Sequence, residues 1–195
     1  SVRGATKTIS SNLTDAEAVE SQQLTSFDSD GFSLGTDTGA NGSGRTFVTW
    51  NWKAGGTAVT NTAGSITSTV SVNTTSGFSI VTATAPAAAA QGTVGHGLGV
   101  TPSMIFLKTR STTYNWSVYH ASVCDTTSKY LRLNDTSALL TFSTVWGASL
   151  PTSSVFGITG DGAGAPSGTF VAYCFAPVAG YSAFGKYTGN GSTDG

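Results

Sequence analysis

Short stretches in which apolar and polar residues alternate run along the whole chain. A period of two is typical of strands that bury one face, and turn signals such as Asp30–Gly31 and Asn41–Gly44 separate the stretches. The segments that alternate most clearly are 46–52, 77–82, 104–108, 116–120, 130–133 and 170–175. The pattern therefore predicts an all-β fold made of short strands.

One segment departs from this pattern. Residues 15–20 combine Asp, Ala, Glu and Val without strict alternation, and Thr14 or Asp15 can act as a helix cap. We expect one or two helical turns there and no other helix.

Internal repetition is the second organising feature of the chain. Residues 1–50 resemble residues 122–173 at an offset that stays between 121 and 124. A further match opens near the C-terminus. The matched pairs are Ser1–Lys7 with Ser122–Lys129, Asn12 with Asn134, Phe32–Leu34 with Phe156–Ile158, Asp37 with Asp161, Ser43–Gly44 with Ser167–Gly168, Thr46–Trp50 with Thr169–Tyr173, and Gly77–Ser79 with Gly180–Ser182.

The repeat predicts how the chain is divided. It predicts that residues 1–56 are the C-terminal part of a first copy, and that residues 77–179 are a complete copy. Residues 180–195 begin a further copy, and residues 57–75 are a Ser/Thr/Asn/Gly-rich linker or an added hairpin. The chain is then one complete unit flanked by partial units, whose strands we expect a neighbouring segment or another chain to complete.

Composition narrows the classes of function. Only 10% of the residues are charged, against roughly 25% in an ordinary soluble domain, whereas 26 Ser and 32 Thr supply neutral polarity. The formal net charge is −1 and Lys and Arg do not cluster, so electrostatic binding to nucleic acid is excluded. No window of 18 apolar residues occurs, so we expect no membrane insertion.

Several of these segments resemble a known family. The segments 26–32, 47–56, 94–105, 116–120 and 173–191 are similar to a repeat domain of bacteriophage virion proteins, especially tail-fibre-like proteins of marine phages. The resemblance implies an antiparallel β-sandwich of lectin-like or jelly-roll type in tandem repeats. It also implies a place at the virion surface or outside the cell, contacts with other virion proteins, and a homo-oligomer, a trimer by analogy. It brings no catalytic motif.

The residues themselves favour neither catalysis nor a cofactor. The chain has two histidines, His96 and His120, and two glutamates, Glu17 and Glu20, which both lie in the helix-like stretch. Hydrolytic triads, metal centres and glycosidase acid pairs normally need more such groups, placed on facing elements. His96 lies between glycines in a turn-rich loop, where its ring either caps backbone groups or touches a ligand. We expect a protein that is not an enzyme.

One acidic turn is a weak candidate for a calcium site. Asp28 and Asp30, with Gly31, resemble the beginning of a calcium-binding loop. The equivalent stretch of the second copy, Thr152–Ser154, carries no acid. We therefore interpret the segment as a plain Asp-Gly turn and expect no metal.

The two cysteines, Cys124 and Cys174, align with Arg3 and Asn51 of the first copy, so they are not part of a shared framework. They could form one disulfide, or remain buried thiols if the protein assembles in a reducing cytoplasm.

Aromatic residues are the best candidates for binding a ligand. Aromatic faces cover the apolar C–H patches of sugars while Asn and Asp satisfy the hydroxyls. Tyr114, Asn115 and Trp146 lie near loops, and with His96 they are the predicted ligand-binding residues. We interpret the Trp50/Trp52 pair as core, because Tyr173 and Phe175 match it on one face of an alternating strand.

The main functional hypothesis is a structural component of a phage particle, a tail-fibre-like appendage with host surface glycans as the expected ligand. The alternatives are a carbohydrate-binding, lectin-like module and a capsid-decorating or extracellular surface protein.

Overall fold

The computed structural model describes residues 2–162 and 164–193. Ser1 and residues 194–195, the outer ends of the predicted segments 1–56 and 180–195, lie outside the described residues. The N-terminal elements are β1 (Lys7–Thr8), β2 (Ala18–Val19), β3 (Leu24–Phe27), β4 (Phe32–Leu34) and α1 (Thr38–Asn41). The remaining elements are β5 (Val59–Asn61), β6 (Ser68–Asn73), β7 (Phe78–Thr84), β8 (Gln91–Gly95), β9 (Met104–Thr109), β10 (Ser117–His120), β11 (Lys129–Arg132), β12 (Leu140–Thr141), β13 (Val155–Thr159) and β14 (Thr169–Phe175).

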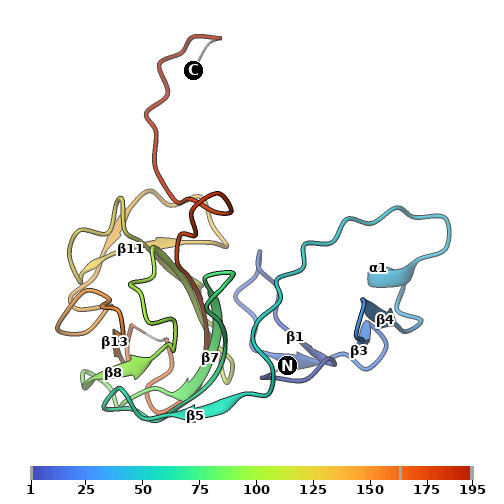
Figure 1. The fold of residues 1–195 in the computed structure, drawn as a ribbon, viewed down its shortest axis with the longest axis horizontal. Coiled ribbons are helices and arrows are strands. Elements are labelled where there is room, and N and C mark those ends of the chain that lie inside the picture. Colours follow the sequence, from blue (N-terminus) through green and yellow to red (C-terminus); the bar gives the residue numbers. More distant parts are fainter. Residues whose placement is uncertain (1, 163, 194–195) are drawn as a thin grey trace.

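An eight-stranded antiparallel sheet forms the body of the molecule (Figure 1). Its strand order is β12-β11-β10-β9-β14-β7-β6-β5, which places the last strand of the sequence in the centre. On β14, Phe175 pairs with Phe78 of β7 on one side and with Met104 of β9 on the other. The all-β class that the alternation predicts is confirmed, with antiparallel sheets.

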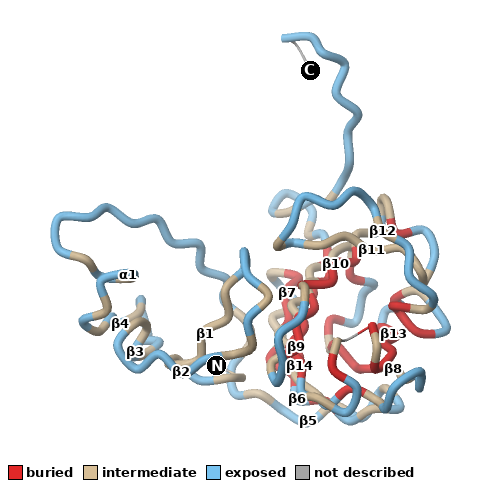
Figure 2. The backbone as a smooth tube through the Cα atoms, turned by 180° about the vertical axis from the view of Figure 1, so that it is seen from behind, coloured by how far each residue is buried: buried red, intermediate tan, exposed pale blue. Residues whose placement is uncertain are grey.

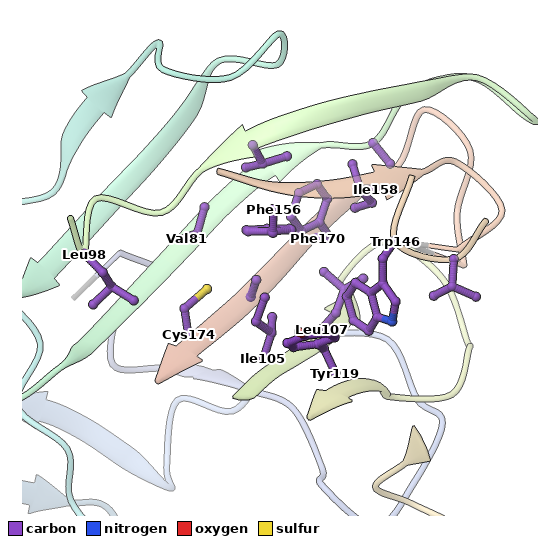
Figure 3. Close-up of a cluster of buried hydrophobic side chains, with 14 of the residues drawn as sticks. Val81, Leu98, Ile105, Leu107, Tyr119, Trp146, Phe156, Ile158, Phe170 and Cys174 are labelled. Carbon is purple, nitrogen blue, oxygen red and sulfur yellow. The ribbon is translucent and has the colours of Figure 1, made fainter. Parts of the chain in front are cut away.

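The hydrophobic core lies between this sheet and the β8–β13 pair (Figure 3). Phe170 and Cys174 point into it from β14, while Phe156 and Ile158 reach it from β13, and all four are fully buried. Residues 170, 172 and 174 enter the core and residues 173 and 175 do not, because successive side chains of a strand point to opposite faces.

Both cysteines are free and buried. Burial raises the pKa of the Cys174 thiol to about 12, and burial also raises the pKa of Cys124. Of the two states that the sequence left open, the structure has the buried thiols.

Five of the six segments with clear alternation are strands: β7, β9, β10, β11 and β14. The sixth prediction, a strand over residues 46–52, is wrong for this structure. These residues are all exposed and lie in no ladder, because no strand among the described residues runs beside them. Figure 2 shows the segment as part of an exposed loop that leaves α1.

The predicted helix over residues 15–20 is also wrong. The backbone N–H of Glu17 donates to the carbonyl of Arg110 at 3.0 Å, and that of Glu20 donates to Thr6 at 2.8 Å. These amides pair with other parts of the chain, so Ala18–Val19 becomes the short strand β2 beside β1. A four-residue helix, α1, forms instead where Asp37 accepts hydrogen bonds from the amides of Gly39 and Ala40.

Residues 57–75 hold an antiparallel hairpin, β5–β6, in place of a free linker. β6 pairs with β7 from Thr69↔Thr82 to Asn73↔Phe78, so the hairpin extends the main sheet. Val70 of β6 is part of the core. The sheet thus extends beyond residue 77, where the predicted complete copy begins. The division of the chain into repeat copies stays a prediction.

The N-terminal residues 2–56 form a layer of short elements beside the body (Figure 1). Most of this layer is partly or fully exposed, whereas the buried residues gather in the sheet and the β8–β13 pair (Figure 2). None of the helices in the described residues has the length and apolar character needed to cross a membrane.

The core position of Phe170 gives a first prediction. Phe170→Ala should lower the free energy of unfolding by about 3–5 kcal/mol, because it removes a fully buried ring and leaves a cavity. Phe47, which matches Phe170 in the repeat, is 47% exposed, so Phe47→Ala should cost no more than about 0.5 kcal/mol. Urea unfolding of both variants measures the difference, and equal losses would contradict the assignment of the core.

Candidate functional site

The outer face of the eight-stranded sheet carries an open groove with a volume of about 910 Å³. Its floor comes from β7, β9 and β14, and its sides come from residues before β5 and after β14. The lining residues are mostly aromatic or apolar: Ser11, Trp50, Trp52, Ser76, Phe78, Ile80, Met104, Phe106, Trp116, Leu133, Tyr173, Phe175, Ala176, Tyr181, Ser182, Ala183 and Phe184.

Phe175 is the centre of an aromatic cluster in this groove. Its ring centroid lies 4.8 Å from that of Phe78 and 5.7 Å from that of Phe106, on the two neighbouring strands. Trp52 approaches it edge-on at 6.1 Å, and Phe184 lies at 6.2 Å. Such offset and edge-to-face ring pairs contribute stabilising energy beyond that of the area they bury. Phe175 on the floor therefore helps to hold Trp52 on one side of the groove and Phe184 on the other.

The walls present aromatic surface to solvent. Trp50 is 75% exposed, Trp52 is 58% exposed and Tyr181 is 71% exposed. No described interaction occupies the faces of Trp50 and Tyr181. Flat aromatic rings at the rim of an apolar groove are suited to stacking against a ligand.

The other end of the groove is fixed by Trp116, which directly precedes β10. Its ring stacks on that of Tyr173 at 6.4 Å, and its indole N–H donates to the carbonyl of Ser10 at 2.9 Å. This hydrogen bond ties the N-terminal segment to the sheet, so Ser11 lies at the groove.

An ion cluster around Glu17 also anchors the N-terminal segment. Glu17 accepts from Arg3 at 2.7 Å and from Arg110 at 2.8 Å and 3.0 Å. Burial by itself raises the pKa of Glu17, but the hydrogen bonds and positive charges of Arg110 and Arg3 outweigh it, so the pKa lies below its usual value. The carboxylate therefore stays ionised at neutral pH.

The groove itself is electrically neutral. None of the residues lining it is an Asp, Glu, Lys, Arg or His. Burial raises the pKa of Tyr173 despite the opposing charge of Arg3, so its phenol remains protonated. The polar groups of the lining residues include the hydroxyls of Ser11, Ser76, Ser182, Tyr173 and Tyr181 and the indole N–H groups of Trp50 and Trp52.

Trp146, a predicted ligand-binding residue, is fully buried. Its indole N–H donates to the carbonyl of Lys129 at 2.9 Å, and its ring meets Tyr119 edge-on at 5.7 Å. The expected exposure of Trp146 is wrong, because the loop that carries it folds inward over the core.

His96 is fully buried as well. Its Nδ1 accepts the amide hydrogen of Leu98 at 3.2 Å, so Nε2 carries the proton and donates to the carbonyl of Thr152 at 3.1 Å. Burial lowers the pKa of His96, which keeps the ring neutral. Of the two roles proposed for His96, the structure has the one that caps backbone groups.

Tyr114 and Asn115 lie near the surface but not in the groove. Tyr114 is 39% exposed, and its ring lies so close to Gly164 that any side chain at that position would overlap it. Asn115 accepts a hydrogen bond from Asn134 at 2.8 Å, and Asn134 in turn accepts the amide hydrogen of Trp116 at 2.8 Å. Both residues therefore have structural partners, and whether they bind a ligand stays a prediction.

Asp28 closes the hairpin between β3 and β4. Its two carboxylate oxygens accept hydrogen bonds from Ser26 and Ser33, each at 2.8 Å, and these bonds lower its pKa. Its amide donates to the carbonyl of Gly31 at 3.0 Å, which defines the turn. Asp30 is exposed in this turn, and across the described residues no three His, Cys, Asp or Glu side chains gather in a way that could hold a metal ion.

The sequence pattern does not reveal the groove, because it assigns the exposed tryptophans to the core and the buried one to the surface. The sequence pattern predicts Trp50 and Trp52 in the core, but both are exposed, and it predicts Trp146 at the surface, but Trp146 is buried. The predicted core position rested on the match of this segment with β14 and is wrong. The signal that could have found the groove is the outer face of β14 itself, because Tyr173 and Phe175 alternate with core residues and still carry large rings.

Comparison with known proteins gives one match. The model of a family described as a domain of unknown function, DUF7483, matches residues 1–195. The chain belongs to this family. No curated protein and no solved structure matches it. The groove and the exposed segments beside it are therefore the features of this DUF7483 chain that bear on its function.

The Glu17 cluster gives a second prediction. Because the folded-state pKa of Glu17 is lowered, the carboxylate stabilises the fold above its ordinary pKa of 4.5, and this contribution is lost as the pH falls through the lower folded-state value. Glu17→Gln should therefore lower the free energy of unfolding by about 1–3 kcal/mol at neutral pH. The two proteins should converge in strongly acidic solution.

Denaturant unfolding over a pH series measures this effect. Asp125→Asn is the control, since it breaks the ion pair between Asp125 and Lys129. The Asp125 side chain is 68% exposed, so we expect no measurable change in the free energy of unfolding. A Glu17→Gln effect that is constant with pH would contradict the ionised cluster.

Proposed function

We propose that this protein is a non-enzymatic structural module of a phage particle, a tail-fibre-like appendage, which contacts host surface glycans through the aromatic groove. The groove, with Trp50, Trp52 and Tyr181 exposed at its rim, is the observation that supports glycan binding. The structural part rests on the resemblance in segments such as 94–105 and 173–191, and on a surface rich in hydroxyls and poor in charge.

The ligand of this proposal is a neutral saccharide. Sugar rings present apolar C–H faces to aromatic rings and hydroxyls to small polar groups, and the groove offers both. An acidic sugar would bring a carboxylate to a surface without a cationic partner, and desolvating that charge is unfavourable.

The sandwich type and the tandem arrangement of units are part of the same proposal. We propose that the eight-stranded sheet and the β8–β13 pair are the two layers of a lectin-like or jelly-roll sandwich, and that such units occur in tandem at the virion surface. Support comes from the core that lies between these two layers. Copies of the protein would assemble with one another, as a trimer by analogy with phage fibres, and with other virion proteins.

A carbohydrate-binding module outside any phage particle is the second candidate, and the groove favours it equally. A capsid-decorating or extracellular surface protein would have the same hydroxyl-rich surface. These alternatives differ in where the protein is found, and the groove chemistry is common to all of them.

Glycan binding is tested on an array of neutral and acidic glycans. We expect binding to neutral glycans, with a roughly tenfold weaker Kd for Trp52→Ala, which corresponds to about 1.4 kcal/mol. Trp52 is largely exposed, so this variant should keep the fold. Tyr187→Ala is the matched control, because Tyr187 is 93% exposed and does not line the groove. A lack of binding to every glycan on the array, or equal effects of the two substitutions, would contradict the proposed glycan binding.

The place of the protein in a particle is tested by immunogold electron microscopy with an antibody against the chain. Label on the tail appendages supports the main proposal. Label spread over the capsid favours decoration, and label away from any particle favours the independent module.

A further inference from the structure

The tripeptide Asn-Gly-Ser occurs twice in the chain, as Asn41–Ser43 and as Asn190–Ser192. In such a sequence the backbone nitrogen of the glycine can attack the side-chain amide of the asparagine, because glycine has no Cβ to hinder the approach. The local sequence is the same at both places. Any difference in reactivity between the two asparagines therefore comes from the structure.

The first copy of the tripeptide is held by the helix α1. Asn41 is the last residue of α1, and its backbone amide donates to the carbonyl of Asp37 at 2.8 Å. Its side-chain NH2 group donates to the carbonyl of Gly35 at 2.8 Å. A Cβ built on Gly42 would lie only 2.7 Å from the carbonyl oxygen of Thr38, so this glycine is packed as well. Rotating the Gly42 nitrogen onto the Cγ of Asn41 would break these contacts.

The second copy lies in the C-terminal tail. Figure 1 shows the chain leaving the body after β14 and ending as an extended segment, and residues 185–193 are all exposed. Within the described residues, neither the side-chain NH2 group of Asn190 nor the amide of Gly191 donates a hydrogen bond. Both groups can therefore rotate without losing such a contact.

One contact of Asn190 favours the attack. Its Oδ1 accepts the amide hydrogen of Ser192 at 2.9 Å. When a nitrogen attacks Cγ, negative charge develops on Oδ1, and a donor already aimed at this oxygen stabilises that charge. Gly191 has a φ of 74°, which glycine adopts without strain and which turns the chain so that Ser192 reaches the Asn190 side chain.

We propose that Asn190 is a site of spontaneous deamidation in the folded protein, with water as the co-reactant, and that α1 protects Asn41 from the same reaction. The Gly191 nitrogen gives up its proton and forms a bond to the Cγ of Asn190. The bond between Cγ and the side-chain nitrogen then breaks, and this nitrogen leaves as ammonia with the proton that the backbone nitrogen released. One water molecule hydrolyses the resulting cyclic imide at either of its carbonyls, which gives aspartate or isoaspartate at residue 190.

The reaction changes the charge and the backbone of the tail. Each event replaces a neutral amide with a carboxylate, so the formal net charge of −1 becomes more negative by one. Opening of the imide to isoaspartate also adds one carbon atom to the backbone path. Only 10% of the residues are charged, so one added charge should resolve an acidic form of the protein on isoelectric focusing.

Peptide mapping of the folded chain tests the proposal. The protein is incubated at mildly alkaline pH, digested briefly with pepsin in acid, and analysed by liquid chromatography and mass spectrometry. We expect Asn190 to convert into aspartate and isoaspartate while Asn41 stays intact in the same sample. Incubation in urea is the matched control, because the unfolded chain should convert both asparagines at the same rate.

Gly191→Ala tests the route of the reaction. The added Cβ hinders attack by the backbone nitrogen, so conversion of Asn190 should be lost. No other part of the chain lies within 4 Å of that Cβ, so the fold of the body should not change.

Asp37→Ala tests the protection of Asn41. The Asp37 side chain accepts hydrogen bonds from the amides of Gly39 and Ala40 at 2.9 Å and 3.1 Å, which begin α1. Without this cap the helix should open, and Asn41 should convert in the native protein while conversion of Asn190 stays the same.

Three results would overturn the proposal. They are equal conversion of Asn41 and Asn190 in the folded chain, an Asn190 that converts only in urea, and a conversion of Asn190 that Gly191→Ala does not slow. An Asn41 that stays intact in Asp37→Ala would contradict its protection by α1. All of these readouts are independent of glycan binding.

Discussion

The structure depends on one strand, β14, that is covered with large apolar side chains on both faces. Phe170 and Cys174 point into the core beneath β8 and β13, and Tyr173 and Phe175 form the floor of the groove on the other side. A strand of this kind is stable only in the centre of a sheet, with partners on both edges, and β7 and β9 supply them. The sheet thereby gains a second apolar surface that the β8–β13 pair does not cover.

That second surface explains why segments before β5 and after β14 gather on it. Trp52 and Phe184 contact Phe175 from segments more than a hundred residues apart, and Trp116 links the N-terminal segment to the opposite end of the groove. They cover the surface only in part, which leaves a neutral aromatic groove. Ligand binding is thus proposed for this face of the molecule.

Residues 46–52 and 169–175 show the limit of what a pattern can predict. Both alternate with a period of two and both carry aromatic residues, yet β14 is one of the two central strands and residues 46–52 belong to no sheet. The pattern describes a strand that needs a partner, whereas the presence of the partner depends on the rest of the fold. For the same reason Trp50 and Trp52 are exposed where the match with Tyr173 and Phe175 placed them inside.

The sequence by itself determined the all-β class and the positions of β7, β9, β10, β11 and β14, because alternation and turn residues act locally. It also determined that the protein is poor in charge, since only 10% of its residues are charged. Only the tertiary structure decided that Trp146 and His96 are buried with backbone partners, that Glu17 binds two arginines in place of forming a helix, and that Trp50 and Trp52 face solvent. Each of these outcomes depends on contacts between residues far apart in the chain, which no local pattern encodes.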